Sequence, residues 1–200
     1  MPTASLQPAI QRVVDAAAVK GVTIEVTVFD ESTHTAAEAA AALGTELGQI
    51  VKSLVFVVPT ADGPAPLLCL MAGHNRVDVA RLAAVSGAAD VRRASAREAH
   101  DLTGFAIGGI PPIGHDRPMR AIMDPDLGRY PVVWAAAGLS TAVFPVPPGT
   151  LRILANATVA PIAEERSDDD RGAVPTRAGP SGDAVATAGG RSDGGQSEPR

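Results

Sequence analysis

Helix and strand signals follow one another in an irregular order along this chain, and that order constrains the fold more than any other feature. A doubly wound nucleotide-binding fold requires a regular alternation of strand and helix, which is not found here. We therefore predict an α+β fold with a curved, mostly antiparallel mixed sheet surrounded by helices. Strands are expected at 22–29, 50–58, 67–71, 119–123, 132–136, 141–146 and 158–162, and helices at 5–20, 35–44, 77–85, 95–103 and 150–154.

Local signals place several of these boundaries. Ser5 is a candidate cap for the first helix, and Gly21 follows it as a left-handed stop. Thr35–Glu38 and Ser95–Glu98 have the spacing of capping boxes. The turn sequence 61–64 joins two apolar runs, so these runs are expected to pair as a hairpin.

Composition separates one domain, residues 1–165, from a tail, 166–200, that is poor in large apolar residues and is predicted to be disordered. The formal net charge of −5 argues against strong non-specific binding of nucleic acid, DNA included. No apolar stretch is long enough to cross a membrane, no signal peptide is recognisable, and a cytoplasmic protein is expected. The single cysteine, Cys69, lies in an apolar run and is predicted to be a core residue. The four histidines have no metal-ligand spacing, so neither a metal nor a cofactor is expected.

Lysine is rare: only Lys20 and Lys52 occur among 17 Lys and Arg residues. Lys52 lies within the apolar run 50–58, where a strand is predicted. An ammonium on a flexible stem differs from the rigid guanidinium fork and responds to partial desolvation. Two interpretations follow: a lysine that reaches into a functional pocket, or a strand-edge lysine that extends to water.

The segment 103–118 contains four glycines and three prolines. Glycine permits close approach of the backbone to a ligand, and proline makes the intervening chain rigid. The segment lacks the spacing of a phosphate-binding loop. It is either a rigid loop at a pocket or a structural turn.

Within this segment, Gly109-Ile110-Pro111-Pro112-Ile113-Gly114 resembles the Gly-x-x-Pro-x-Gly loop of the YbaK/EbsC family, free-standing relatives of the prolyl-tRNA synthetase editing domain. The resemblance extends over about residues 5–164. It includes 41–56 with Lys52, 73–78, 103–105, 122–124 and the small-residue segment 134–138.

The resemblance implies a trans-editing hydrolase that deacylates mischarged aminoacyl-tRNA, with proline tRNA carrying a small wrong amino acid as the expected substrate. It also implies the site. Lys52 and Gly109 are the expected catalytic residues, and the expected substrate-binding residues are Gly108, Pro112, Gly114, Asp124 and Gly138. The expected partners are the acceptor end of the tRNA and, in addition, prolyl-tRNA synthetase or an elongation factor.

Several alternatives remain open from the sequence. Asp124 is either a pocket residue or a turn carboxylate, and His115 is expected to face solvent rather than act as a base. A local basic rim has seven candidates: Arg76, Arg81, Arg92, Arg93, Arg97, Arg117 and Arg120. Arg117 and Arg120, which flank the loop, are expected to form it, whereas the other five are expected to be solvated. Ala136 and Ala137 replace residues typical of cysteine-specific members, and the stretch 29–35 is shorter than theirs, which leaves alanyl, seryl and threonyl esters as substrates.

Two other functions are also considered. A non-catalytic module that binds tRNA ends or a synthetase would share the fold. A lysine enzyme that forms a Schiff base would need a neighbour that lowers the pKa of Lys52, and none is evident from the sequence.

Overall fold

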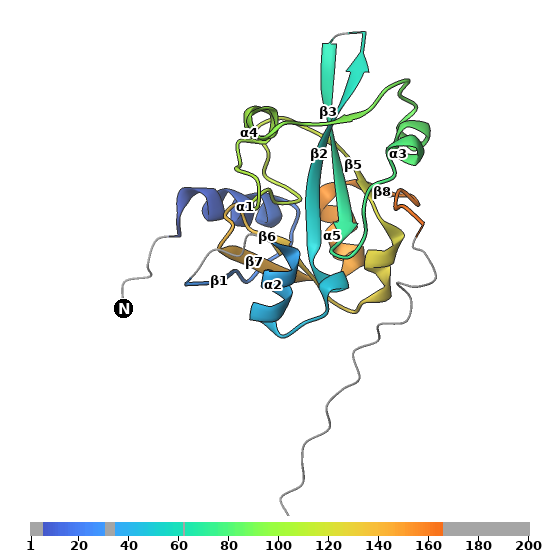
Figure 1. Ribbon diagram of the computed structural model, residues 1–200. Coiled ribbons are helices and arrows are strands. Elements are labelled where there is room, and N and C mark those ends of the chain that lie inside the picture. Colours follow the sequence, from blue (N-terminus) through green and yellow to red (C-terminus); the bar gives the residue numbers. More distant parts are fainter. Residues whose placement is uncertain (1–5, 31–34, 62, 166–200) are drawn as a thin grey trace, which may run out of the picture. The chain divides into compact units, whose positions relative to one another are not determined.

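Five α-helices and two β-sheets make up the part of the chain that the computed structural model describes, residues 6–30, 35–61 and 63–165 (Figure 1). Ser5, residues 31–34 of the short stretch noted above, and the tail 166–200 that was predicted to be disordered lie outside the described residues. The predicted mixed α+β class is confirmed. The strands, however, divide between two sheets.

The larger sheet is mixed and has five strands. In spatial order they are β4 (Arg92–Arg93), β2 (Val51–Thr60), β3 (Gly63–Ala72), β5 (Arg120–Met123) and β8 (Ala157–Val159). The long hairpin β2–β3 is antiparallel, with Lys52 opposite Met71, as the turn sequence between the two runs predicted. The contacts of β5 with β3 and with β8 are parallel.

The smaller sheet is antiparallel, with β7 (Ala142–Val146) between β1 (Thr27–Val28) and β6 (Val133–Ala136). Only two residues of the predicted strand 22–29 pair, because β7 offers β1 a partner only at its first two positions. A parallel bridge between Ile50 and Trp134 links the two sheets where β2 begins.

The helices begin and end where local signals occur. They are α1 (Pro8–Val19), α2 (Ala36–Leu43), α3 (Val79–Ser86), α4 (Ala96–Thr103) and α5 (Pro148–Ala155), with 3₁₀ turns η1 (Leu47–Gln49) and η2 (Pro125–Arg129). Both capping boxes are confirmed, at Thr35 for α2 and at Ser95 for α4. The N-cap of α1 is Gln7, and α3 begins two residues later than predicted because the Asp78 side chain caps it.

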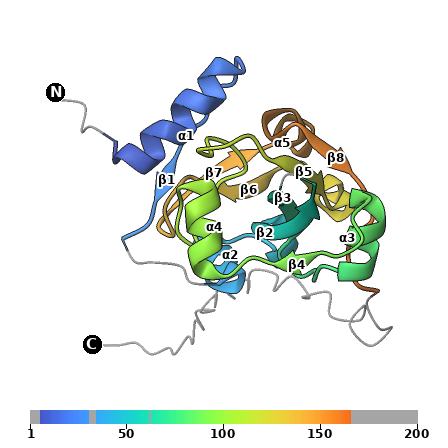
Figure 2. The ribbon, with the colours of Figure 1, turned by 90° about the horizontal axis from the view of Figure 1, so that it is seen from above.

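The two faces of the β2–β3 hairpin contribute to two different apolar clusters, because successive side chains of a strand point to opposite faces. Val51 and Leu70 belong to the cluster that includes α1, whereas Phe56 and Met71 belong to the cluster that includes α3. Figure 2 shows these two helices on opposite sides of the hairpin. Cys69 is fully buried in the second cluster, and its burial raises the pKa of the thiol to about 12. The prediction of a core cysteine is confirmed.

Candidate active site

A cavity of about 320 Å³ lies between the beginning of β2, helix α2, the loop after α4 and the β6–β7 hairpin. Its walls are mainly small and aliphatic, with hydroxyl groups and two cations among them. The residues that line it include Lys52, Ser53, Arg93, Gly108, Ala136 and Leu139. A concave, mostly apolar site with a few polar groups is typical of a small-ligand pocket.

One wall of the cavity is an unpaired stretch of the edge of β2. Strand β4 pairs with β2 only at Phe56 and Val57, and the carbonyl of Val55 accepts a hydrogen bond from the amide of Ala94 at 2.9 Å. Alternate residues of a strand direct their backbone groups to the same side, so the N–H and C=O of Ser53 point toward this open edge. The Ser53 hydroxyl is buried and has no hydrogen-bond partner among the described residues. A ligand in the cavity would therefore meet polar groups that the fold leaves available.

Lys52 also lines the cavity, but its side chain extends from the face of β2 opposite to that of Ser53. Its ammonium donates a hydrogen bond to the carbonyl oxygen of Asn75. The Asn75 side chain in turn donates to Asp124 at 2.7 Å and to Asp126 at 2.9 Å. A chain of hydrogen bonds thus fixes the position of the lysine.

The surroundings of Lys52 disfavour its charge. Burial lowers the pKa of its ammonium, and the nearby positive charges of Arg93 and Arg76 lower it further, whereas Asp124 opposes the shift. The expectation that no neighbouring group lowers the pKa of this lysine is therefore wrong. Arg93 was expected to be a solvated charge, because only the pairing of β4 with β2 brings it near Lys52.

The predicted loop glycines bring the loop against the β6–β7 turn. Gly108 lines the cavity and has a φ of +92°, a conformation that L-amino acids with side chains rarely adopt. The amide of Gly109 donates to the carbonyl of Ala106 at 3.0 Å, so its hydrogen is committed within the loop. A Cβ at Gly109 would lie 2.7 Å from the Cα of Leu139, and one at Gly138 would lie 2.7 Å from the carbonyl oxygen of Ala9. Both glycines therefore permit close packing behind the cavity wall.

The other predicted site residues lie elsewhere. Pro112 and Gly114 line a second cavity, of about 370 Å³, together with residues of α1 and α5. Asp124 is almost completely buried, and besides the side chain of Asn75 it accepts hydrogen bonds from the amides of Ala72 and Asp126. The structure thus brings Lys52 and Gly108 together at one cavity, with Gly109 and Gly138 behind its wall. Asp124 reaches Lys52 only through Asn75.

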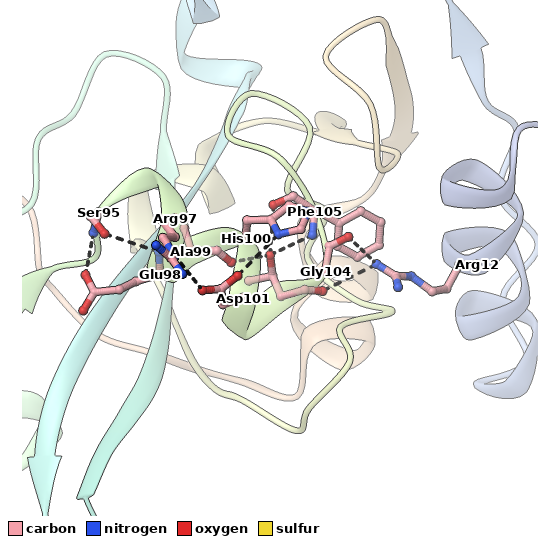
Figure 3. Close-up of polar contacts among 10 residues, drawn as sticks. Arg12, Ser95, Arg97, Glu98, Ala99, His100, Asp101, Gly104 and Phe105 are labelled. Carbon is pink, nitrogen blue, oxygen red and sulfur yellow. Dashed lines mark hydrogen bonds and ion pairs between the residues drawn. The ribbon is translucent and has the colours of Figure 1, made fainter.

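Arg12 of helix α1 contacts the start of the loop. Its guanidinium lies 3.8 Å from the centre of the Phe105 ring, donates to the carbonyl of Gly104 at 3.0 Å and pairs with Asp116 at 2.7 Å. Figure 3 shows Arg12 reaching from α1 toward Gly104 and Phe105, which follow α4 at the end opposite to its capping box.

The expectation that His115 faces solvent is wrong. This side chain is partly buried, bonds the carbonyl of Pro111 through Nε2 at 2.8 Å and meets the edge of Phe105. Burial lowers its pKa, and it lines the second cavity rather than the first. Arg117 also lines the second cavity, whereas Arg120 donates to the carbonyls of Val85 and Ser86 at the end of α3. The predicted rim of Arg117 and Arg120 therefore does not form at the Lys52 cavity.

Among the described residues, those that line the Lys52 cavity do not include a histidine, cysteine, aspartate or glutamate. Within 6–30, 35–61 and 63–165, no three such residues are placed to hold a metal ion together, and no helix is long and apolar enough to cross a membrane. The arrangement can bind an ester, orient a water molecule and stabilise developing negative charge by donors and cations.

Comparison with known proteins assigns the family. The family model of the aminoacyl-tRNA editing domain matches residues 30–154, so the chain belongs to this family, and the expected aminoacyl-tRNA editing hydrolase is confirmed. A crystal structure of a candidate trans-editing enzyme for prolyl-tRNA synthetase superposes with a TM-score of 0.74 at 44% identity, covering 80% of this chain and 100% of that one.

Two relatives have names that state which aminoacyl-tRNA they deacylate. EbsC of Enterococcus faecalis, a candidate Cys-tRNA(Pro)/Cys-tRNA(Cys) deacylase, is 28% identical over 130 residues, which are 64% of this chain and 77% of the relative. The multifunctional Ser/Thr-tRNA deacylase ProXp-y of Escherichia coli is 33% identical over 82 residues, 41% of this chain and 49% of the relative. The residues matched by the family model, 30–154, include all those that line the Lys52 cavity.

Proposed function

We propose that the chain acts in trans on proline tRNA that carries a small wrong amino acid, and that the Lys52 cavity is where the ester is hydrolysed. The observation that carries the proposal is the placement of Lys52, Ser53 and Gly108 around one small cavity. The similarity to a candidate trans-editing enzyme for prolyl-tRNA synthetase supports proline tRNA as the tRNA.

The proposed reaction is attack of water on the carbonyl carbon of the aminoacyl ester. The carbonyl oxygen becomes an oxyanion, the bond to the ribose oxygen breaks, and the proton of the water passes to that oxygen. An ester is already an activated acyl group, so positioning and charge stabilisation are sufficient to accelerate the reaction. The N–H and hydroxyl of Ser53 are the proposed donors to the oxyanion, because the N–H points toward the open edge of β2 and the hydroxyl has no hydrogen-bond partner among the described residues.

Lys52 and Arg93 are the cations at the cavity, and their proposed role is to hold the negatively charged 3′ end of the tRNA. Gly108 lets the loop backbone approach the substrate closely, with Gly109, Pro112, Gly114 and Gly138 fixing the loop's path. Asp124 is proposed to position Lys52 through Asn75, without contact to substrate.

Selection is proposed to work by exclusion: the cavity admits small side chains and rejects larger ones. Its volume is at the lower end of the range for ligand pockets, about 300–1,000 Å³. Ala136, one of the residues that departs from cysteine-specific members, lines it. Alanyl, seryl and threonyl esters are the proposed substrates.

The enzyme is proposed to meet its substrate in the cytoplasm, on tRNA released by prolyl-tRNA synthetase or carried by an elongation factor. Its acidic composition fits a protein that contacts only the acceptor end. Residues 1–165 are proposed to be sufficient for activity.

The two lysines provide the test. Lys52→Ala should lower kcat/KM for proline tRNA charged with alanine by about 10- to 100-fold, because a hydrogen bond between a charged group and the 3′ end contributes about 1.5–3 kcal/mol. Lys20→Ala is the matched control, because Lys20 is exposed and its side chain bonds only the carbonyl of Ile153 among the described residues. It should retain the wild-type rate.

Retention of activity by folded Lys52→Ala would contradict the proposed site. If the wild type binds proline tRNA charged with alanine but hydrolyses neither this nor any other mischarged proline tRNA, the chain is instead a binding module with the fold of an editing domain.

A further inference from the structure

Most arginines that the structure describes have a carboxylate partner or are bonded to backbone carbonyls. Ion pairs join Arg12 to Asp116, Arg81 to Asp78, Arg92 to Glu98, Arg97 to Asp101 and Arg129 to Asp126. Arg76 and Arg93 have no ion pair of this kind among the described residues, and both are exposed. These two arginines also lie near Lys52, the cation at the cavity.

The backbone brings the three cations together from different parts of the chain. Arg93 is opposite Phe56 in the β4–β2 pairing and lines the cavity with Lys52. Arg76 follows Asn75, whose carbonyl accepts the hydrogen bond from the Lys52 ammonium. One cation thus comes from β2, one from β4 and one from the turn after β3.

Grouping like charges is unfavourable: burial is the main cause of the lowered pKa of Lys52, and the charges of Arg93 and Arg76 lower it further. The chain has a formal net charge of −5, so carboxylates are plentiful, yet among the described residues Asp124 is the carboxylate that acts in the opposite direction on Lys52. A cationic group whose arginines have no ion pair among the described residues, next to a ligand cavity, fits an anion that arrives with the substrate.

We propose that Arg76 and Arg93, together with Lys52, form a subsite for the RNA backbone next to the aminoacyl cavity, which binds phosphodiesters of the single-stranded 3′ end. Guanidinium groups suit phosphate because they form two parallel hydrogen bonds to its oxygens. The proposal rests on the proposed function for the identity of the RNA, and its test uses binding rather than hydrolysis.

The test measures binding of a deacylated proline-tRNA acceptor microhelix as a function of salt concentration, by fluorescence anisotropy. Each phosphate contact of a single strand contributes about 0.7 to the slope of log K against log salt. Arg93→Gln and Arg76→Gln should each reduce the slope by about 0.7 and weaken binding several-fold at low salt. The variants and the wild type should bind similarly at high salt. Arg93→Lys, which keeps the charge, should restore most of the slope.

Arg152→Gln is the matched control. Arg152 is also exposed and also lacks an ion pair among the described residues, but its helix, α5, contributes no residue to the Lys52 cavity. This variant should bind like the wild type. A wild type that does not bind the microhelix would overturn the proposal, as would slopes unchanged in Arg93→Gln and Arg76→Gln or reduced equally in Arg152→Gln.

The outcome is separate from that of the deacylation experiment. Salt-dependent binding that requires Arg76 and Arg93 would support the subsite even if no ester were hydrolysed. Conversely, hydrolysis that depends on Lys52, with a salt slope insensitive to both arginines, would refute the subsite and leave the deacylase intact.

Discussion

At the scale of single residues, the charge of Lys52 is held in surroundings that oppose it. Burial and two arginines lower the pKa of the ammonium, while the hydrogen bond to the Asn75 carbonyl keeps the side chain in place. Because the pKa is lowered from 10.5, the proton is lost at a lower pH than from an ordinary lysine.

This shift predicts a pH dependence of RNA binding. Affinity for the deacylated microhelix should fall as the pH rises through the lowered pKa, because the neutral amine no longer attracts phosphate. In Lys52→Arg the fall should move to a higher pH, since guanidinium keeps its proton. The same pH profile for both proteins, measured by anisotropy between pH 7 and 10.5, would show that Lys52 does not control binding.

Unfolding of the protein would not explain a fall in RNA affinity as the pH rises. The unfolded chain binds the Lys52 proton more tightly than the folded one, so this group's contribution to the free energy of unfolding increases as the pH rises from the folded pKa to 10.5. Loss of binding in this interval, with an unchanged circular dichroism spectrum, would report the site itself.

Some residues of the candidate site can be predicted from the sequence, and others cannot. Lys52 could be found because it is one of two lysines and interrupts an apolar run. Arg93 and Ser53 could not: the first is placed by strand pairing between distant segments, and the second is an ordinary strand residue until one edge of β2 is left unpaired. The sequence left two interpretations of Asp124 open, because the side chain that bonds it, Asn75, is placed by the turn after β3.

At the scale of elements, the loop after α4 depends on Gly109 for its contact with the β6–β7 turn. A Cβ at this position would lie 2.7 Å from the Cα of Leu139, a backbone atom that cannot move aside as a flexible side chain would. Gly109→Ala should therefore lower the free energy of unfolding by about 1–3 kcal/mol and displace Gly108 from the cavity. Activity should decrease in parallel, as measured by denaturant unfolding and by deacylation.

The matched control is Gly128→Ala, because a Cβ at Gly128 meets no atom within 4 Å and the residue has no positive φ. It should leave both stability and activity near wild type. If Gly109→Ala kept the stability and activity of Gly128→Ala, the loop would have room to shift. Close packing against Leu139 would then not be required to keep the loop at the cavity.

Elements that depend on local signals were predicted well. The capping boxes at Thr35 and Ser95 and the left-handed glycine at Gly21 act within a few residues, so the sequence alone determines them. In the strand predicted at 22–29, Ile24 is buried, but Val28 is exposed and only Thr27–Val28 form a strand. Its length depends on how much of β7 is available, which no local pattern reveals.

At the scale of the whole molecule, the loop 103–118 separates two cavities. Its first half, with Gly108, lines the Lys52 cavity, and its second half, with Pro112 and Gly114, lines the cavity against α1 and α5. The sequence presented these residues as one motif, and contiguity in the chain suggested one site. Only the path of the loop between α1 and the β6–β7 hairpin divides them.

The central claim is that the Lys52 cavity hydrolyses the ester of a small wrong amino acid on proline tRNA. The most direct measurement is a deacylation panel, with proline tRNA charged separately with alanine, serine, threonine, cysteine and proline. Wild type, Lys52→Ala and Lys20→Ala should be compared under the same conditions. We predict release of alanine, serine or threonine but not of proline, lost in Lys52→Ala and kept in Lys20→Ala. Release of proline at the same rate as the others, or equal rates for wild type and Lys52→Ala, would contradict the account.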